Sequence, residues 1–255
     1  MLQPWQTGKV IKIENETNST RRFWIQLPGL ESFDFKAGQF VTIDLPIHEK
    51  PNKRWRSYSI ASWPDGTNVF ELVIVMLEGG AGTHYLFNEV SVGSELTLRG
   101  PQGVFVLPDI IDRDLFFICT GTGIAPFRSM SHHIFNHSIS HGDIYLIFGC
   151  RKFGDALYKT ELEELGGKLE RFHYIPVFSR EIRDDINKHL RTGYVHAVYE
   201  EICRNNIKIS VADEAAIIKP ASFFLCGWKN MIDEAKQRIQ SLGYDRKSIH
   251  QELYG

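Results

Sequence analysis

The pattern of apolar residues changes near Pro108, and this change divides the chain into two kinds of fold. Before it, short segments alternate polar and apolar residues between glycine and proline turns, which predicts an antiparallel β-barrel. After it, continuous apolar strands alternate with helical segments, which predicts a parallel sheet covered on both faces. We therefore expect a β + α/β protein, with an antiparallel barrel in residues 1–108 and a parallel-sheet α/β domain in residues 109–255.

The two parts differ in the elements that their patterns predict. In the first part we expect short strands at residues 9–13, 22–27, 39–45, 69–77 and 95–99. One helix is expected near residues 83–89, with Thr83 as its N-cap after a glycine-rich turn. In the second part we expect strands at residues 115–120, 144–149, 172–178, 222–226 and 248–252, with helices near 126–136, 155–165, 198–205 and 229–242.

Composition argues against several function classes. The formal net charge of -2 argues against nucleic-acid binding driven by bulk charge. No apolar run reaches the roughly 18 residues of a membrane helix, and no basic stretch followed by an apolar core opens the chain, so we expect neither membrane insertion nor a secretory signal. The cysteines form no CxxC pair, which argues against zinc or iron–sulfur ligation and favours reduced thiols in the cytoplasm. They are Cys119, Cys150, Cys203 and Cys226.

Residues 56–62 (Arg-Ser-Tyr-Ser-Ile-Ala-Ser) combine a guanidinium, a phenol and hydroxyls on one expected strand. Strand alternation places Arg56 and Tyr58 on one face and Ser57 and Ser59 on the other. A flat, charged ligand would find a stacking face in Tyr58 and a phosphate-binding fork in Arg56. An amphipathic edge strand without a ligand explains the same pattern, so this segment alone leaves both interpretations open.

The first expected parallel strand ends in a glycine turn at residues 120–126 (Thr-Gly-Thr-Gly-Ile-Ala-Pro). Gly121 and Gly123 allow the backbone to approach a pyrophosphate, and the N–H groups of the next helix would face the anion. Pro126 suits the first helical turn, where a missing N–H costs nothing. The turn lacks the third glycine of the GxGxxG fingerprint, and a tight turn without a ligand is the alternative.

Other candidate residues follow the later parallel strands, whose carboxyl ends share one rim. Ser179 and Arg180 combine a hydroxyl with a guanidinium, which suits a phosphate monoester, although a solvated loop is the usual place of an arginine. Cys226 ends another strand, where a buried structural thiol is the alternative. Tyr254 is either part of a frayed tail or a lid over a flat ligand.

Taken together, these segments resemble the ferredoxin–NADP⁺ reductase family, and the resemblance covers essentially the whole chain. Residues 56–62 match its Arg-x-Tyr-Ser-x-x-Ser/Thr flavin motif, and residues 79–83 (Gly-Gly-Ala-Gly-Thr) look like its second flavin segment. Residues 121–126 match its pyridine-nucleotide turn. The remaining matches are Gly-Pro-x-Gly-x-Phe at residues 100–105, Phe148-Gly149-Cys150-Arg151 with Asp155, Tyr158 and Glu161, and Cys226-Gly227 with Met231.

The resemblance implies an FAD-dependent oxidoreductase that transfers electrons between NADPH and a one-electron carrier, ferredoxin or flavodoxin. Because the sequence has no cluster-binding cysteine set, we expect this carrier to be a separate protein. Two alternatives use the same scaffold: an NAD(P)H-dependent flavin or small-molecule reductase, and the flavin-bearing electron-transfer subunit of a larger complex. Lys50, Lys53 and Arg54 form either a basic rim for an acidic carrier or a solvated loop.

The resemblance also implies roles by position at the flavin. Tyr58 would stack on the isoalloxazine with Ser59 near its reactive nitrogen, and Tyr254 would cover the far face. Arg56 and Thr83 would hold the FAD pyrophosphate. The full implied set of cofactor-binding residues is Arg56, Tyr58, Ser59, Ile74, Gly82, Thr83, Gly121, Thr122, Gly123, Pro126, Arg151, Ser179, Arg180, Cys226, Gly227, Met231 and Tyr254.

At the nicotinamide nucleotide, Cys226 would lie by the hydride-transfer point with Glu252 nearby. Ser179 and Arg180 would hold the 2′-phosphate of NADP(H), so NADPH is expected to be preferred over NADH. The residues implied in catalysis are Ser59, Cys226, Glu252 and Tyr254.

Two positions depart from the family pattern. Trp228 stands in place of the proline of Cys-Gly-Pro, which would alter the loop under the nicotinamide. Gly255 follows Tyr254, whereas the aromatic residue is the last one in the plant-type enzymes. The extra glycine would affect how tightly Tyr254 stacks on the flavin, and therefore how strongly the protein prefers NADPH over NADH.

Overall fold

The computed structural model describes residues 3–181, 191–209 and 216–254. By their contacts these residues fall into two compact units. The first holds the described residues of Met1–Leu107 together with Ala125–Ser138, and the second holds those of Pro108–Ile124 and Ile139–Gly255. The chain therefore passes from one unit to the other after Leu107, after Ile124 and after Ser138. A domain boundary at residues 108 and 109 stays a prediction.

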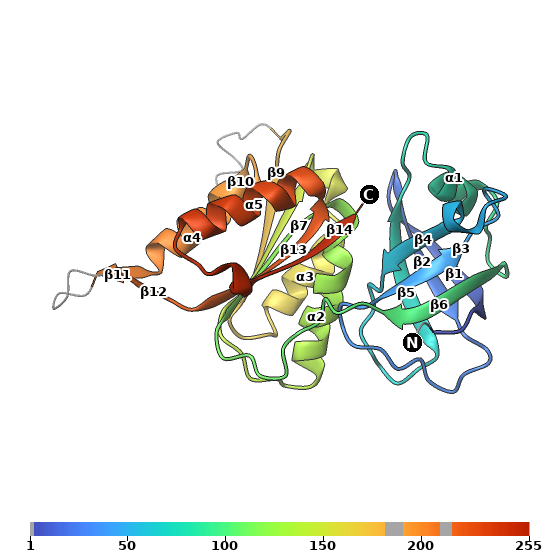
Figure 1. The fold of residues 1–255 in the computed structure, drawn as a ribbon, viewed down its shortest axis with the longest axis horizontal. Coiled ribbons are helices and arrows are strands. Elements are labelled where there is room, and N and C mark those ends of the chain that lie inside the picture. The colour runs from blue at the N-terminus through green and yellow to red at the C-terminus, as the bar shows by residue number, and fades with distance from the viewer. Residues whose placement is uncertain (1–2, 182–190, 210–215, 255) are drawn as a thin grey trace. The chain divides into compact units, whose positions relative to one another are not determined.

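Six antiparallel strands form the sheet of the first unit (Figure 1). They are β1 (Gln6–Thr17), β2 (Thr20–Gln26), β3 (Phe40–Asp44), β4 (Trp55–Ser59), β5 (Val69–Val75) and β6 (Glu95–Gln102). Their order is β4-β3-β6-β1-β2-β5, and a bridge between Ile60 and Leu72 joins the two ends of this row. The Ala61 N–H donates to the Glu71 carbonyl at 2.8 Å beside that bridge. The sheet thus closes, which confirms the predicted antiparallel barrel.

Three short elements complete the first unit: the 3-10 turn η1 (Pro51–Lys53) and the helices α1 (Ala81–Asn88) and α2 (Ala125–Asn136). The prediction of Thr83 as the N-cap of α1 was wrong, because the helix begins at Ala81 with Gly80 as its N-cap. Gly79 turns the chain at a φ of 71°, which favours glycine, and this turn starts the helix earlier.

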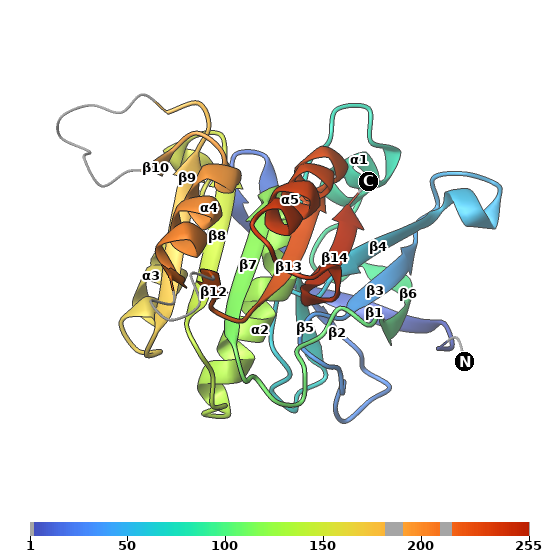
Figure 2. The ribbon, with the colours of Figure 1, turned by 60° about the vertical axis from the view of Figure 1, so that its left-hand side comes forward.

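The second unit is built on a six-stranded sheet whose neighbours pair in parallel (Figure 2). In spatial order its strands are β10 (Arg191–Thr192), β9 (Phe172–Phe178), β8 (Ile144–Cys150), β7 (Asp114–Thr120), β13 (Ala221–Trp228) and β14 (Ile249–Tyr254). All residues of β7 up to Cys119 are buried, as expected for a strand covered on both faces. This confirms the predicted parallel sheet. Strands β11 (Ile207–Ile209) and β12 (Ala216–Ile218) pair separately.

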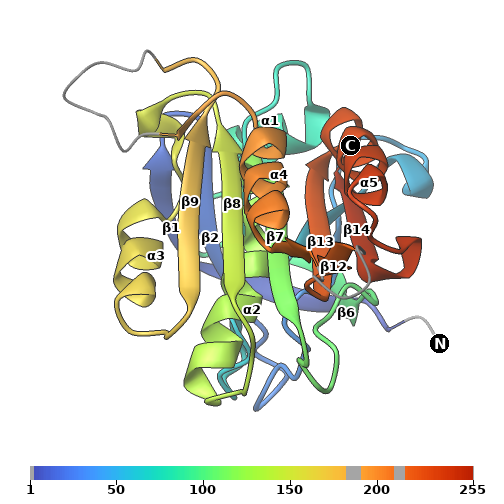
Figure 3. The ribbon, with the colours of Figure 1, turned by 90° about the vertical axis from the view of Figure 1, so that its left-hand side faces the viewer.

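Helices cover both faces of this sheet. Helices α4 (Val195–Asn205) and α5 (Lys229–Ser241) lie on one face, and α3 (Lys159–Gly166) lies on the other (Figure 1, Figure 3). Helix α3 begins later than its sequence pattern predicts, because Phe153–Asp155 form the 3-10 turn η3 and Tyr158 has a left-handed φ of 53°. The other 3-10 turns are η2 (Gly121–Ile124) and η4 (Arg246–Ser248). Within the described residues, no helix is long and apolar enough to cross a membrane.

Candidate functional site

The segment predicted to seat the flavin begins as strand β4 and then crosses to β5. Arg56 and Tyr58 both pair with residues of β3. The strand ends at Ser59 rather than at Ser62, because the chain turns at Ile60 to form its bridge with β5. The segment is therefore paired with β3 before the turn and with β5 after it.

Tyr58 is half-buried and packs against the apolar cluster inside the barrel. Burial raises the pKa of its phenol to about 12, against an opposing effect of the Arg56 guanidinium. The ring is therefore uncharged near neutral pH and suited to stacking on a flat aromatic ligand. Ser59 follows it and is buried.

Arg56 lies against the start of helix α1. A Cβ placed on Gly82 would lie 3.1 Å from the Arg56 Cγ and 3.2 Å from its Nε, so the side chain passes directly over this glycine. The Arg56 Nη1 donates to the carbonyls of Trp55 at 2.8 Å and Lys53 at 3.1 Å. The backbone N–H groups of the first turn of α1 have no partner within the helix. Arg56 and this turn together form a cationic, donor-rich corner that fits a pyrophosphate.

Thr83 and Ile74 occupy positions that limit how they could contact a cofactor. The Thr83 hydroxyl donates to the Gly80 carbonyl at 3.0 Å and accepts from the Leu77 N–H at 3.1 Å. Its single proton is used, so only its backbone N–H can donate to a phosphate. The Ile74 side chain is buried in the barrel core. Any contact of Ile74 with a flavin would therefore involve its backbone.

The glycine turn predicted to hold a second nucleotide forms η2, directly after strand β7. Gly121 has a φ of 55°, and a Cβ on it would meet nothing within 4 Å, so the turn is open at this point. A Cβ on Gly123 would lie only 2.5 Å from the Cys226 carbonyl oxygen. Thr122 lies between these glycines, and Pro126 is the second residue of α2. The backbone is thus exposed on one side of the turn and packed against β13 on the other.

Two of the residues predicted to act in catalysis are neighbours in the parallel sheet. Cys226 of β13 is fully buried and pairs in register with Glu252 of β14 on one side and with Cys119 of β7 on the other. Gly227 follows with a φ of 140°, and a Cβ on it would lie 2.5 Å from the Thr120 Oγ1. The ends of β7 and β13 therefore approach closely beside the glycine turn.

Two further residues were predicted at this rim, Tyr254 and Met231, and the structure describes the side chain of Met231 only. Tyr254 pairs through its backbone with Trp228, which is 56% exposed. The Tyr254 side chain and Gly255 lie outside the part described, so the predicted stacking of Tyr254 stays a prediction. Met231 belongs to α5 and its side chain is buried in the apolar core of the second unit, a position that favours packing over ligand contact.

Ser179 and Arg180, predicted at the 2′-phosphate, lie at the end of β9 beside Arg151, a predicted cofactor-binding residue at the end of β8. The Ser179 N–H donates to the Cys150 carbonyl at 2.9 Å, and the Arg180 N–H donates to the Arg151 carbonyl at 2.9 Å. These backbone bonds hold the two turns side by side, while Ser179, Arg180 and Arg151 remain exposed. The Ser179 hydroxyl donates to the Cys150 carbonyl at 3.3 Å and would have to turn to reach a ligand. Two guanidiniums with such a hydroxyl on adjacent turns fit a phosphate monoester.

Phe153 is a candidate that sequence reasoning missed. Its ring is 49% exposed and follows Arg151 by two residues, and it packs against Phe178 at a centroid distance of 5.7 Å. The Lys159 Nζ lies 4.9 Å from the centroid of the ring. The sequence signal that would have pointed to it is an aromatic residue two positions after Arg151, because such a ring can stack on a purine base.

Two thiols of the second unit, Cys119 and Cys150, are held in the neutral form. Burial raises the pKa of Cys119 well above its usual range, and burial with the nearby carboxylates raises the pKa of Cys150 to about 12. None of the four cysteines forms a disulfide. Neutral thiols are poor nucleophiles, so the chemistry of this rim does not depend on covalent catalysis by Cys119 or Cys150.

Comparison with known proteins assigns both halves of the chain. Residues 7–107 match the model of the oxidoreductase FAD-binding domain, and residues 117–237 match that of the oxidoreductase NAD-binding domain. The chain is 34% identical to ferredoxin–NADP reductase B of Sorangium cellulosum over 225 residues, which cover 88% of this chain and 87% of the relative. The chain belongs to the ferredoxin–NADP reductase family. The predicted family, fold class and cofactors are thereby confirmed.

Relatives of this reductase-family chain extend beyond ferredoxin–NADP reductases. It is 28% identical to the glycine betaine monooxygenase reductase subunit of Pseudomonas aeruginosa, with 99% of this chain matched but only 66% of that subunit. Among solved structures, a ferredoxin NADP⁺ reductase from Neisseria gonorrhoeae with bound FAD and NADP superposes with a TM-score of 0.75 at 24% identity, covering 98% of both chains. This likeness shows the fold.

The residues described above fit the two cofactors of the family. The corner formed by Arg56 and the first turn of α1 suits the FAD pyrophosphate, and the uncharged Tyr58 ring suits a flavin. The open backbone of Gly121 and the paired turns of Arg151 and Arg180 suit a phosphorylated dinucleotide. The protein is an FAD-dependent NAD(P)H oxidoreductase of the ferredoxin–NADP reductase type.

Proposed function

We propose that this enzyme transfers electrons between NADPH and a separate one-electron carrier protein, ferredoxin or flavodoxin. When bound, FAD supplies the conversion between two-electron hydride chemistry and one-electron transfer. The preference for NADPH over NADH is proposed from one observation: two adjacent turns bring Arg151, Ser179 and Arg180 together. NADH lacks the 2′-phosphate that these three groups are suited to bind.

The residues of this chain would share the work as follows. Arg56 and the backbone of Thr83 would hold the FAD pyrophosphate, and Tyr58 and Ser59 would orient the flavin ring. Cys226 and Glu252 would line the nicotinamide position from adjacent strands, where their fixed register sets the approach of the ring.

Phosphate contacts would hold the nicotinamide nucleotide at the same rim. Gly121, Thr122 and Gly123 would receive its pyrophosphate through their backbone, together with the first turn of α2 at Pro126. The predicted role of Tyr254 as a movable cover of the flavin belongs to the same proposal.

The carrier is proposed from two lines of support. A relative covered over most of its length has a name that pairs ferredoxin with NADP. On this chain, Lys50 and Lys53 are exposed just before the flavin strand and suit an acidic partner. Arg54 is less available than expected, because its guanidinium forms a two-point ion pair with the Asp44 carboxylate. The basic rim is therefore redefined as Lys50 and Lys53.

A second candidate is the flavin-bearing electron-transfer subunit of an oxygenase complex. The match along 99% of this chain to a monooxygenase reductase subunit favours it. A flavin or small-molecule reductase is the third possibility on the same scaffold. The absence of disulfides among the four cysteines supports a reducing compartment, and we propose the cytoplasm.

A steady-state comparison tests these functions. The enzyme is given ferredoxin, flavodoxin or free flavin as acceptor, with NADPH or NADH as donor. The proposal expects the highest kcat/KM with NADPH and a protein carrier. Highest activity with free flavin would favour the small-molecule reductase, and low turnover with every soluble carrier, together with co-purifying subunits, would favour the subunit of a complex.

A further inference from the structure

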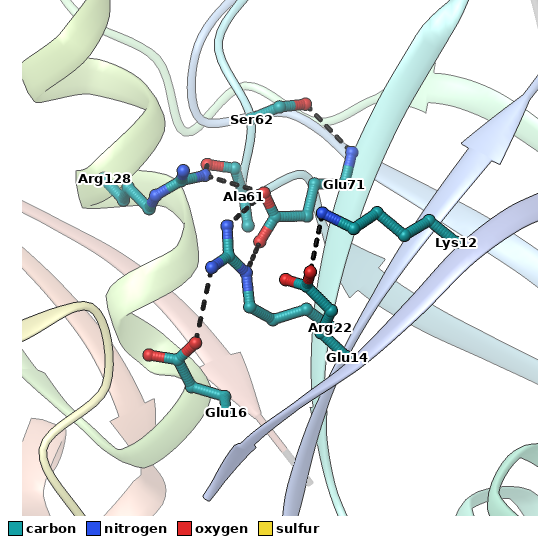
Figure 4. A network of polar contacts seen from close by, with 8 residues as sticks. All are labelled: Lys12, Glu14, Glu16, Arg22, Ala61, Ser62, Glu71 and Arg128. Atoms are coloured by element: carbon teal, nitrogen blue, oxygen red, sulfur yellow. Dashed lines mark hydrogen bonds and ion pairs between the residues drawn. The ribbon is translucent and has the colours of Figure 1, made fainter. Parts of the chain in front are cut away.

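A buried network of charged groups connects helix α2 to the segment that follows Ser59 (Figure 4). The side chains of Arg128 and Glu71 are only 5% and 3% exposed, and the Arg128 Nη1 lies 3.1 Å from the Glu71 Oε2. Arg22 meets the same carboxylate at two points, with its Nε at 2.6 Å and its Nη2 at 3.0 Å. A carboxylate this deeply buried is stable only when it is paired, so the network is tightly specified.

The network holds the flavin segment as well as the helix. The Arg128 Nη1 also donates to the Ala61 carbonyl at 2.8 Å. The Ser62 hydroxyl accepts from the Glu71 N–H at 3.0 Å, and the Glu71 carbonyl accepts from the Ala61 N–H at 2.8 Å. Ala61 is thus held on two sides, by β5 and by α2, and Ser62 is held by β5, two to three residues after Ser59 at the predicted flavin ring.

A second contact lies one helical turn further along α2. The His132 ring stacks on the Trp63 ring at a centroid distance of 4.1 Å and an angle of 22°. The Arg128 guanidinium carbon lies 5.3 Å from the centroid of the same indole. Residues four apart share one face of a helix, so Arg128 and His132 together contact the Ala61 carbonyl and the Trp63 ring.

We propose that Arg128 is a positioning residue that fixes the first turn of α2 relative to the flavin segment Arg56–Ser62. That turn carries Pro126 and presents the N-terminal end of the helix, where the pyrophosphate of the nicotinamide nucleotide is proposed to bind. Arg128 is buried and bound to Ala61 and Glu71, so it would act by setting the position of one binding element relative to the other. The inference rests on the proposed function for the location of the two cofactors, but its test does not require the carrier to be known.

The test compares Arg128→Met with Arg22→Met. Both variants remove one arginine from Glu71 and leave the other in place, but only Arg128 belongs to α2. Reduction of the bound flavin by excess NADPH is followed by the loss of its absorbance in a stopped-flow instrument. We expect Arg128→Met to slow the limiting rate at least about tenfold, since a small misplacement of reacting groups costs this much or more. Arg22→Met should stay within about twofold of the wild type.

Further readouts separate positioning from folding. The dissociation constant of FAD, measured by fluorescence, should change less than about threefold in Arg128→Met, and chemical reduction by dithionite should remain complete. The absorbance change that NADP⁺ produces in the oxidised flavin should be altered in Arg128→Met and kept in Arg22→Met. Arg128→Lys, which keeps a positive charge and N–H donors on a single nitrogen, should recover part of the lost rate.

Specific outcomes overturn the inference. Equal losses in Arg128→Met and Arg22→Met would show a general structural role of the ion pairs, and a wild-type rate in Arg128→Met would show that the contact does not position the helix. If Arg128→Met does not fold, His132→Ala provides the second test, with a slower limiting rate expected at unchanged FAD affinity and a wild-type rate overturning the inference. If the wild-type enzyme is reduced by NADPH but serves no protein carrier, the proposed function fails and this comparison still stands.

Discussion

Gly123 packs so closely on Cys226 that a Cβ at position 123 would lie 2.5 Å from the Cys226 carbonyl oxygen. The turn predicted to bind the nucleotide is therefore packed directly against the strand end that carries the predicted catalytic thiol. The contact is with backbone, which cannot rotate away as a side chain would. Even one methyl group at this point has to displace η2 or the end of β13.

Gly123→Ala should accordingly weaken both stability and nucleotide binding. We expect a loss of about 1–3 kcal/mol in the free energy of unfolding, the usual cost of overpacking, together with weaker NADP⁺ binding. Chemical denaturation and titration calorimetry measure the two effects. Gly29→Ala is the matched control, because a Cβ on Gly29 meets nothing within 4 Å and Gly29 belongs to the first unit. Wild-type NADP⁺ binding in Gly123→Ala would contradict the assignment of this turn.

Arg180→Ala should shift the preference between coenzymes. Loss of one charge-assisted contact with the 2′-phosphate, about 1.5–3 kcal/mol, should lower kcat/KM for NADPH by about one to two decades. The value for NADH should barely change, since NADH offers no partner for this guanidinium. Lys168→Ala removes a positive charge from an exposed position after α3 and serves as the control. Equal losses with both coenzymes would contradict the role of Arg180.

Neutralising Lys50 and Lys53 together to glutamine should weaken the interaction with an acidic carrier. We expect a higher KM for ferredoxin, a smaller dependence of that KM on salt, and an unchanged KM for NADPH. A double variant at Lys9 and Lys168 removes the same charge from other exposed positions and is the control. If the KM values for ferredoxin and NADPH rise equally, the two lysines do not form a carrier-binding rim.

The pKa of Tyr58 gives a prediction about alkaline pH. Burial raises this pKa from 10.0 in the unfolded chain to about 12 in the folded protein. A raised pKa means that the folded state holds the proton more tightly, so the stabilisation is complete below pH 10.0 and is lost as pH rises toward 12. The difference corresponds to about 2–3 kcal/mol. The free energy of unfolding, measured by denaturation at each pH from 9 to 12, should decrease less with rising pH for Tyr58→Phe than for the wild type. An equal decrease in both proteins would show that Tyr58 is not the group responsible.

The sequence predicted most of the strands and helices of this protein, but not β10, β11 or β12, nor the starts of α1 and α3. Alternation before Pro108 and continuous apolar strands after it predicted the barrel and the parallel sheet, because strand burial on one face or on both leaves different patterns. Residues 179–180 were expected at the carboxyl end of a parallel strand, and they directly follow β9, because parallel strands bring their carboxyl ends to one rim. Such inferences need only local periodicity and general rules of topology. The contact of residues 179–180 with residues 150 and 151 was not predicted.

The sequence could not predict contacts that depend on which polar residues face inward. Glu71 lies in an apolar strand, and nothing in its neighbours shows that it meets Arg22 and Arg128, which are 49 and 57 positions away. Thr83 illustrates a local failure of the same kind. Glycine and threonine both favour helix N-caps, and the choice of Gly80 followed from a left-handed turn at Gly79 that only the folded loop reveals.

The placement of α2 has a consequence for anyone who recombines or dissects this protein. The helix lies in the sequence matched by the NAD-binding model, yet it packs with the barrel, where Phe127 meets Phe105 and Met130 abuts Gly38. A fragment that stops at Leu107 would leave the barrel without this cover. A chimera that joins this barrel to the nucleotide domain of another reductase should therefore either bring α2 along or match its contact face to Glu71 and Trp63. The unit to exchange in such experiments is thus the barrel together with α2, which follows the first strand of the second unit in the sequence.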